Sequence, residues 1–170
     1  MTTGSNPKLI ALDWGTSSFR GWLLDGEGKV LDSISADLGI LKVPDQDFQS
    51  VYHQQLNPWF KLHGSVPVIA SGMIGSRQGW VEAPYVACPS GLEELSEQLA
   101  YVPGHSKGNR PLLAIVPGMN HWSEGIPDVM RGEETQVFGA MEEDEPPMIY
   151  ILPGTHLSLI HISEPTRQVL

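Results

Sequence analysis

The sequence has little of what marks secreted, membrane-bound or disulfide-stabilised proteins. Cys88 is the single cysteine among 170 residues, which excludes an intrachain disulfide framework and a four-cysteine zinc site. No apolar run approaches the roughly eighteen residues of a membrane span. The opening MTTGSNPK lacks the apolar stretch of a secretory signal. We therefore expect a soluble, cytoplasmic protein with no membrane partner.

Basic residues are also scarce. Ten lysines and arginines stand against twenty aspartates and glutamates, which gives a formal net charge of −10. Such a surface repels nucleic-acid phosphates and anionic lipids, so we expect no nucleic-acid partner. A small anionic ligand is not excluded, because one local site can oppose the global charge. The 41% of hydrophobic residues suffices for a real core.

The order of apolar segments predicts an α/β fold. Apolar or alternating runs predict strands, and three- and four-residue spacing predicts helices. The predicted strands are 8–13, 19–24, 30–35, 66–71, 112–116 and 148–152, and the predicted helices are 47–62, 91–101 and 133–141. In the first helix we expect Asp47 as N-cap and Pro58 as a bend or an end, and we expect a polar loop over 103–110. A three-stranded meander followed by α/β crossovers is the ribonuclease-H-like order.

The first turn carries a pattern suited to phosphate chemistry. Asp13 ends a predicted strand, where a carboxylate can reach a hydrated Mg²⁺. Gly15 lets the backbone approach phosphate oxygens, and Thr16 and Ser17 add hydroxyl and N–H donors. Arg20 can add a positive charge. A plain hairpin with an acidic, serine-containing turn is the alternative interpretation.

A second apolar strand ends in a similar turn, which contains Gly154 and Thr155. The two turns resemble the phosphate-1 and phosphate-2 loops of the superfamily of sugar kinases, heat-shock chaperones and actin. There the loops face each other across a cleft and hold the β- and γ-phosphates of ATP. The resemblance implies that both turns contact the nucleotide and that Asp13 is the Mg²⁺ ligand.

Four further segments narrow the resemblance. They are SGMIGS at 71–76, GWVEAPY at 79–85, VPG at 116–118 and DVMRGEETQ at 128–136. Together they resemble the 2-dehydro-3-deoxygalactonokinase family, whose members phosphorylate the terminal hydroxyl of 2-keto-3-deoxygalactonate with ATP. The resemblance extends from Leu9 to His156. Another sugar or sugar-acid kinase, a nucleotide-binding regulator of the same fold and a phosphohydrolase remain alternatives.

The substrate of such a kinase carries a carboxylate, which needs a local basic partner. Arg131 is our first candidate and Arg77 the second, and a surface ion pair is the alternative for either. Other candidates for the sugar pocket share glycine-rich or aromatic segments with these arginines. They are Ser71, Gly72, Met73, Trp80 and Tyr85. Core packing is the alternative for Met73, Trp80 and Tyr85.

A kinase also needs a carboxylate that orients the attacking hydroxyl and accepts its proton. The candidates are Asp128, Glu133 and Glu134. Glu133 and Glu134 begin a predicted helix, where acids also stabilise the macrodipole. Adjacent helical positions point about 100° apart, so at most one of the two faces a cleft. No metal cage is implied beyond the Mg²⁺ that accompanies ATP.

The last segment departs from the family. The acidic, proline-containing run 142–147 indicates a boundary, which predicts a lobe over 1–145 and the first strand and turn of a truncated second lobe over 146–156. From Leu157 the sequence resembles a translated sequencing adapter, so we expect 157–170 to carry no evolved information. The strand at 148–152 would then present an unpaired apolar edge.

Overall fold

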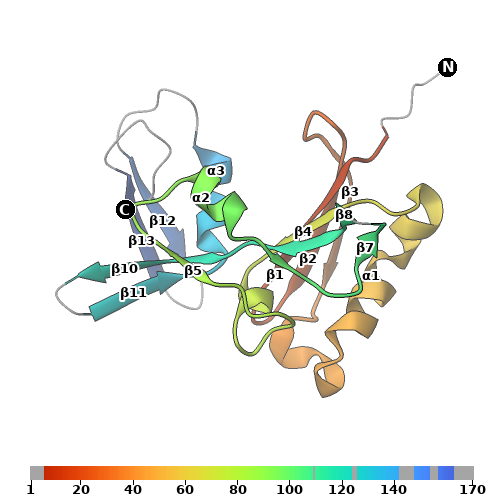
Figure 1. Cartoon of the computed structure of the whole chain (residues 1–170), viewed down its shortest axis with the longest axis horizontal. Coiled ribbons are helices and arrows are strands. Elements are labelled where there is room, and N and C mark those ends of the chain that lie inside the picture. The colour runs from red at the N-terminus through yellow and green to blue at the C-terminus, as the bar shows by residue number, and fades with distance from the viewer. Residues whose placement is uncertain (1–5, 109, 124–125, 142–147, 154–156, 163–170) are drawn as a thin grey trace.

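The main sheet of the molecule has six strands and holds the first candidate turn at one end. The computed structural model describes residues 6–108, 110–123, 126–141, 148–153 and 157–162. The strands run in the order β3-β2-β1-β4-β9-β6 (Figure 1). They are β1 (Leu9–Trp14), β2 (Phe19–Leu24), β3 (Val30–Ala36), β4 (Val68–Ser71), β6 (Ala100–Tyr101) and β9 (Leu113–Ile115). The meander β1–β3 is antiparallel, whereas β1, β4 and β9 are parallel neighbours. The predicted ribonuclease-H-like fold is therefore confirmed.

Strand β1 shows how the sequence pattern places the site. Ile10, Leu12 and Trp14 are at most 3% exposed and belong to the main hydrophobic cluster. The residues between them, including Ala11 and Asp13, are half-buried. Because side chains alternate along a strand, they point to the opposite face of the sheet. The end of that face is where Asp13 meets other candidate residues.

Helix α1 (Phe48–His63) contributes Phe48, Val51, Tyr52, Leu56 and Trp59 to the same cluster. Asp47 caps it as expected, because its carboxylate accepts the Ser50 N–H at 3.0 Å. Pro58 does not end the helix, which continues to His63. Pro58 and Gln54 are both exposed, so the Gln54 carbonyl that a proline leaves without a partner faces water.

A second, smaller sheet has the order β11-β10-β5 and was not predicted from the sequence. Its strands are β5 (Tyr85–Ala87), β10 (Gly118–Ser123) and β11 (Ile126–Met130). It packs with α2 (Leu92–Glu97) and α3 (Glu133–Ala140) around a second hydrophobic cluster. The buried members of this cluster are Val86, Leu95, Met119, Val137 and Phe138. Helix α3 therefore begins between the two sheets.

Two predicted elements were wrong. The helix predicted over 91–101 ends at Glu97, and Ala100–Tyr101 instead form β6. Pairing of β6 with β9 overrides the local helical pattern, because it completes the edge of the main sheet. The loop predicted over 103–110 contains the short strand β7 (Ser106–Lys107) and the first residue of β8 (Arg110–Pro111), which pair with each other.

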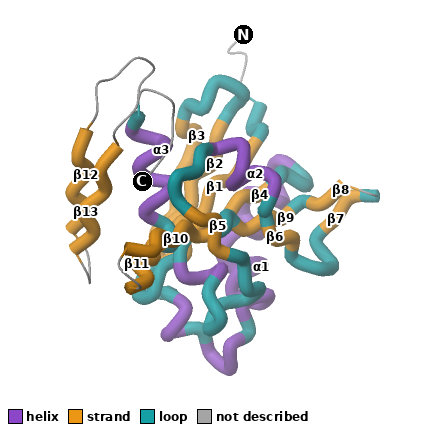
Figure 2. The backbone as a smooth tube through the Cα atoms, turned by 60° about the vertical axis from the view of Figure 1, so that its left-hand side comes forward, coloured by secondary structure: helices purple, strands orange, loops and turns teal. Residues whose placement is uncertain are grey.

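The C-terminal segment forms a hairpin of β12 (Met148–Pro153) and β13 (Leu157–Ile162), which lies beside α3 (Figure 2). The prediction that residues 148–152 present an unpaired edge was therefore wrong for one edge of this strand, because β13 pairs with it. Tyr150 and Leu152 pack against the second hydrophobic cluster. Gly154 and Thr155 lie outside the described residues. The lobe boundaries and the origin of 157–170 stay predictions. Among the described helices, none combines the length and apolar character needed to span a bilayer.

Candidate active site

Asp13 and Arg20 face each other at the end of the first hairpin. They are register partners on β1 and β2, and the Arg20 guanidinium donates to the Asp13 carboxylate. The Asp13 side chain is 20% exposed and that of Arg20 is 48% exposed. A carboxylate that is oriented by a cation and still open to solvent can accept a further positive ligand.

The turn between these two residues is shaped by a segment further along the chain. Ile40 N–H donates to the Gly15 carbonyl at 3.0 Å, and Leu41 N–H donates to the Thr16 carbonyl at 3.3 Å. Thr16 and Ser17 are exposed. The carbonyls of Gly15 and Thr16 thus bond to the 3₁₀ helix at Ile40–Lys42, and the exposed hydroxyl groups of Thr16 and Ser17 are available to a ligand.

We expect Gly39→Ala to destabilise this turn strongly. A Cβ at Gly39 would lie 2.3 Å from backbone atoms of Thr16 and Ser17, so the turn would have to move. The free energy of unfolding should fall by about 3 kcal/mol, measured by urea denaturation. Gly26→Ala is the matched control, because its Cβ would lie 3.6 Å from Lys8 Cγ, an ordinary contact. Equal losses in the two variants would contradict the close contact.

Three backbone segments meet beside Asp13. Gly72 follows β4 with φ +94°, and a Cβ there would lie 2.9 Å from the Trp14 carbonyl oxygen and 3.3 Å from Asp13 Oδ1. Gly132, the residue before α3, has φ +108°, and its Cβ would lie 3.1 Å from the Gly72 Cα. The first turn, the end of β4 and the start of α3 are therefore in direct backbone contact, which only glycines permit.

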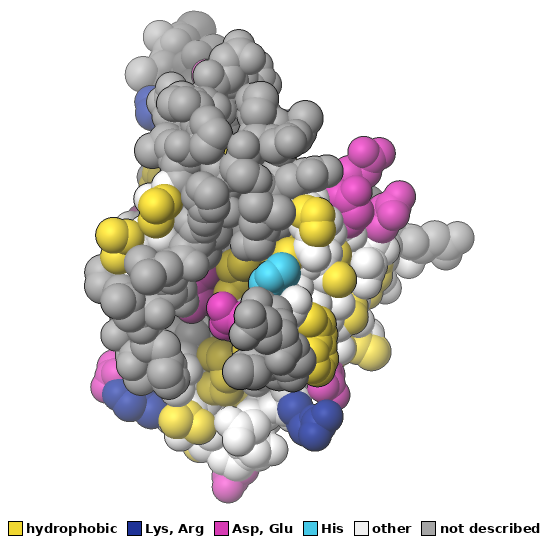
Figure 3. All heavy atoms as spheres, turned by 90° about the vertical axis from the view of Figure 1, so that its left-hand side faces the viewer, with side chains coloured by type: hydrophobic (Ala, Val, Ile, Leu, Met, Phe, Trp, Pro, Cys, Tyr) yellow, Lys and Arg dark blue, Asp and Glu magenta, His cyan; other side chains and the backbone are white. Residues whose placement is uncertain are grey.

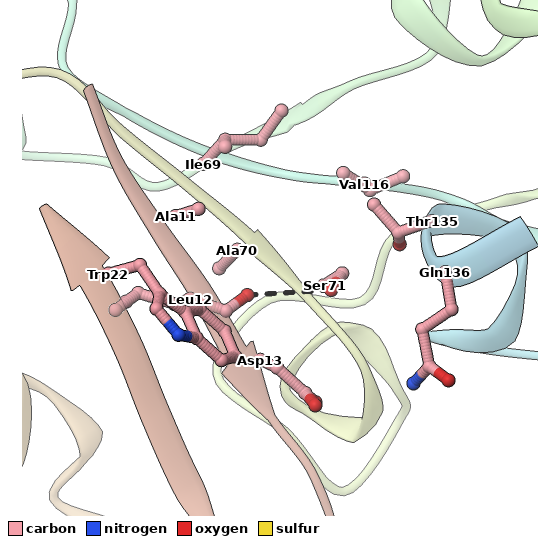
Figure 4. Close-up of a pocket in the computed structure, with 10 residues that line it drawn as sticks. All are labelled: Ala11, Leu12, Asp13, Trp22, Ile69, Ala70, Ser71, Val116, Thr135 and Gln136. Atoms are coloured by element: carbon pink, nitrogen blue, oxygen red, sulfur yellow. Dashed lines mark hydrogen bonds between the residues drawn. The ribbon is translucent and has the colours of Figure 1, made fainter. Parts of the chain in front are cut away.

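A cavity of about 200 Å³ lies against this junction. Ser71, Thr135 and Gln136 add polar groups to its wall beside Asp13, and Trp22 forms part of its apolar floor. Figure 4 shows Thr135 and Gln136 projecting from α3 toward the sheet that carries Asp13 and Trp22. The remaining lining residues are Ala11, Leu12, Ile69, Ala70 and Val116.

Of the ten residues that line the cavity, Asp13 and Ser71 were predicted as site residues, and Trp22, Thr135 and Gln136 are the larger or polar ones that were not. Trp22 could have been found from strand alternation, because it lies two residues after Arg20 on the same face. Thr135 and Gln136 belong to the RGEETQ segment, but which face of α3 meets the sheet is decided by packing.

The three candidate bases lie in different environments. Glu134 is fully buried, its carboxylate accepts the Gly132 N–H at 2.7 Å, and burial raises its pKa to about 7. Glu133 is half-buried, and its Oε2 accepts the Arg131 N–H at 2.9 Å. Of the two adjacent glutamates, Glu133 is therefore the one that is open to solvent, and which of them faces a cleft stays a prediction.

Asp128 belongs to β11, whereas Glu133 and Glu134 begin α3. It is exposed opposite His121 on the neighbouring strand β10. Figure 3 shows the side of the molecule at which Figure 1 places β11, where apolar, acidic and histidine side chains are exposed. Burial, followed by the charge of Asp128, raises the pKa of the Cys88 thiol. This places Asp128 near the outer part of the second sheet.

Arg131 is buried to nine-tenths and ties α3 to the segment that ends in Tyr85. Its Nη2 donates to the Ala83 carbonyl at 2.9 Å, and its Nε donates to Tyr85 Oη at 3.4 Å. The guanidinium carbon lies 4.2 Å from the centre of the Tyr85 ring, within cation–π range. Tyr85 itself is 42% exposed.

The other substrate candidates differ in their exposure to solvent, from exposed to buried. The Arg77 side chain is 89% exposed and forms a loose pair with Glu82 at 3.7 Å. Trp80 packs edge-on against Tyr52 with ring centroids 5.5 Å apart, and Met73 packs against the main cluster. Ser71 is buried and donates to the Leu12 carbonyl at 3.4 Å. The structure thus brings Ser71 and Gly72 to Asp13, whereas Trp80 and Met73 are partly buried against the main cluster.

The sheet order, with an Asp-Trp-Gly-Thr turn after its first strand, defines the class of protein. It is a ribonuclease-H-like lobe of the kind found in sugar kinases and actin-like ATPases. A family model described as 2-keto-3-deoxy-galactonokinase matches residues 13–167. The chain belongs to this family, which confirms the predicted resemblance, although the match continues beyond His156, where the resemblance was predicted to end.

Named relatives agree with this assignment. A Rhizobium meliloti protein named probable 2-dehydro-3-deoxygalactonokinase is 34% identical over 155 residues, which are 91% of this chain and 49% of the relative. The Escherichia coli 2-dehydro-3-deoxygalactonokinase is 33% identical over 149 residues, 88% of this chain and 47% of the relative. A crystal structure of a candidate 2-dehydro-3-deoxygalactonokinase from Sinorhizobium meliloti superimposes with a TM-score of 0.81 at 32% identity, covering 95% of this chain and 51% of that one. The chain therefore spans about half the length of the relatives it matches.

Proposed function

We propose that this chain forms the first lobe of an ATP-dependent kinase that phosphorylates the terminal hydroxyl of 2-dehydro-3-deoxy-D-galactonate. The cellular setting would be galactonate catabolism in the cytoplasm. The observation that carries the proposal is the junction of the Asp13 turn, the end of β4 and the start of α3. At one edge of the sheet it brings together the Asp13 carboxylate, the exposed hydroxyls of Thr16 and Ser17, and the start of α3 with Glu133.

The Asp13 environment fits Mg²⁺ delivered with ATP. The described residues contain no group of three or more His, Cys, Asp or Glu side chains that could hold a metal ion by themselves. Mg²⁺ commonly binds through one or two carboxylates, several waters and the substrate phosphates, so the single partly exposed Asp13 suffices. When bound, the ion would neutralise charge on the β- and γ-phosphates.

The residues of the first turn would bind the nucleotide. Thr16 and Ser17 offer hydroxyl donors to the phosphates, Gly15 lets the backbone come close, and Arg20 contributes charge while it orients Asp13. Gly154 and Thr155 are proposed to close on the phosphates from the other side. Their positions lie outside the described residues.

On the acceptor side, we assign the proton-accepting role to Glu133, because it is the half-exposed glutamate at the start of α3. Glu133 would accept the proton of the substrate hydroxyl while the hydroxyl oxygen bonds to the γ-phosphorus and ADP leaves. Of the two candidate arginines, Arg77 is exposed and Arg131 is buried, so Arg77 would bind the substrate carboxylate. Ser71, Gly72 and Tyr85 would border the sugar.

The 170-residue chain alone is expected to show no kinase activity. Phosphoryl transfer depends on a closed cleft that excludes water, and the chain spans about half of its relatives. The measurement is ADP release with ATP, Mg²⁺ and 2-dehydro-3-deoxygalactonate, and the intact Rhizobium meliloti relative serves as positive control. A rate near that of the relative would show that one lobe suffices.

The activity itself is tested in a fusion of residues 6–153 with the remaining half of the Rhizobium meliloti relative. ADP release that depends on the sugar acid supports the proposed kinase. ADP release that is equal with and without the sugar acid indicates a phosphohydrolase instead. ATP binding without turnover, in a fusion that unfolds cooperatively, indicates a nucleotide-binding regulator.

A further inference from the structure

Arg131 carries a positive charge into the protein interior. Within the described residues, no carboxylate oxygen lies within 4.0 Å of its guanidinium. Its Nη1 is buried and makes no hydrogen bond among these residues. A buried cation is costly unless it is held by other groups, so this arginine has a specific task.

We propose that Arg131 is a positioning residue, which fixes Glu133 relative to the Gly72–Tyr85 segment and does not itself bind the substrate. The proposal rests on the proposed function for its catalytic consequence only. That Arg131 holds this segment follows from its contacts in this chain alone.

The guanidinium is clamped by three parts of the segment. It donates to the Ala83 carbonyl, lies over the Tyr85 ring and approaches Gly75. A Cβ at Gly75 would lie 3.0 Å from Arg131 Nη1 and 2.7 Å from Ile115 Cγ2. Gly75 therefore leaves the space that the guanidinium occupies. A planar fork with a delocalised charge suits this slot, whereas an ammonium group does not.

The segment itself depends on few hydrogen bonds, which makes such a clamp effective. Most of its backbone bonds are local, such as Ser76 N–H to Met73 O, Trp80 N–H to Ile74 O and Ala83 N–H to Gly75 O, and a longer-range bond runs from Gly118 N–H to Pro84 O at its end. Between the end of β4 at Ser71 and the start of β5 at Tyr85 it contains no strand. Arg131 bonds to it from outside.

The same residue connects to the proposed base. Arg131 N–H donates to Glu133 Oε2 at 2.9 Å, so the backbone position of residue 131 sets the position of that carboxylate. Gly132 follows directly and touches Gly72. Movement of the Arg131 side chain would therefore pass to Glu133 and to the edge of the cavity beside Asp13.

Hydrogen exchange on the 170-residue chain tests the clamp. We compare Arg131→Ala with Arg77→Ala, which removes an exposed arginine of the same segment. Arg131→Ala should raise exchange at least tenfold at Ser76, Trp80 and Ala83 and leave β1 and β2 unchanged, whereas Arg77→Ala should change none of them. Gly75→Ala should act like Arg131→Ala, and the double variant should add little. Unchanged exchange in the segment, or an equal rise over the whole chain, would overturn the proposal.

Kinetics of the fusion protein test the consequence for Glu133. Positioning predicts that Arg131→Ala lowers kcat at least tenfold, alters the pH dependence of kcat on its acidic side and leaves KM for the sugar acid within about threefold. Arg131→Lys should not restore kcat. A large rise in KM with kcat unchanged would mean that Arg131 binds the substrate carboxylate directly and would overturn the proposal. If the unmodified fusion lacked sugar-acid-dependent turnover, the proposed function would fail, while the exchange result would still decide the clamp.

Discussion

Asp13→Asn in the fusion protein is expected to lower kcat by about 100-fold or more, with KM for the sugar acid changed by less than about threefold. Asp13 is partly exposed, oriented by Arg20 and placed where β1, β4 and α3 meet. Asparagine keeps the shape of the side chain but removes the charge that holds the metal and its phosphates. Steady-state ADP release against both substrates measures the effect.

Asp37→Asn is the control for this experiment. Asp37 also pairs with a basic residue, Lys42, but its side chain is 82% exposed and it does not line the cavity. The control should keep kcat and both KM values. If Asp13→Asn retained turnover within a few-fold of the parent, Asp13 would lose its assigned role.

Glu134→Gln is expected to change the pH dependence of stability. Burial raises the pKa of Glu134 from 4.5 to about 7, so the folded state binds a proton more tightly than the unfolded state. The parent should therefore lose stability as pH rises from the unfolded pKa to the folded one, and should lose no more above pH 7. Between pH 5 and 8 the loss from this group is about 2–3 kcal/mol.

The variant should lack that loss, because glutamine does not titrate. Urea denaturation at pH 5 and pH 8 would show the unfolding free energy of Glu134→Gln, relative to the parent, rising by about 2–3 kcal/mol. Glu94→Gln is the control. Glu94 accepts the Gly91 N–H at the start of α2, is exposed and has a lowered pKa. Its stabilising effect is lost only as pH falls below its usual pKa, so its difference from the parent should stay constant from pH 5 to 8.

The first hairpin shows what can be predicted from this sequence. Alternation over 19–24 and the small residues after Asp13 depend on neighbours in the chain, so strand, turn and the facing of Asp13 and Arg20 follow from local rules. The position of Asp47 as a cap follows for the same reason.

Other features depend on partners far along the chain. Ala100 and Tyr101 become a strand because β9 lies beside them, and nothing in the local helical pattern indicates this. The sequence made Arg131 the first candidate to bind the substrate carboxylate, yet Ala83 and Tyr85, 46 or more residues earlier, enclose it. The second sheet was missed because β10 and β11 carry polar residues such as Asn120 and Asp128, which interrupt the apolar pattern of a strand.

The contact between Gly39 and the turn at Thr16–Ser17 has a consequence for protein engineering. The shape of the turn depends on a segment more than twenty residues downstream. This segment packs against the turn at Gly39 and donates hydrogen bonds to its carbonyls from Ile40 and Leu41. Transplanting the eight residues DWGTSSFR into another scaffold would therefore transfer the side chains without the segment that fixes the backbone conformation of the turn. A functional graft would have to carry the meander and Leu38–Leu41 as one module. The hydrogen bond from Trp14 Nε1 to the Leu38 carbonyl would then hold the two parts together.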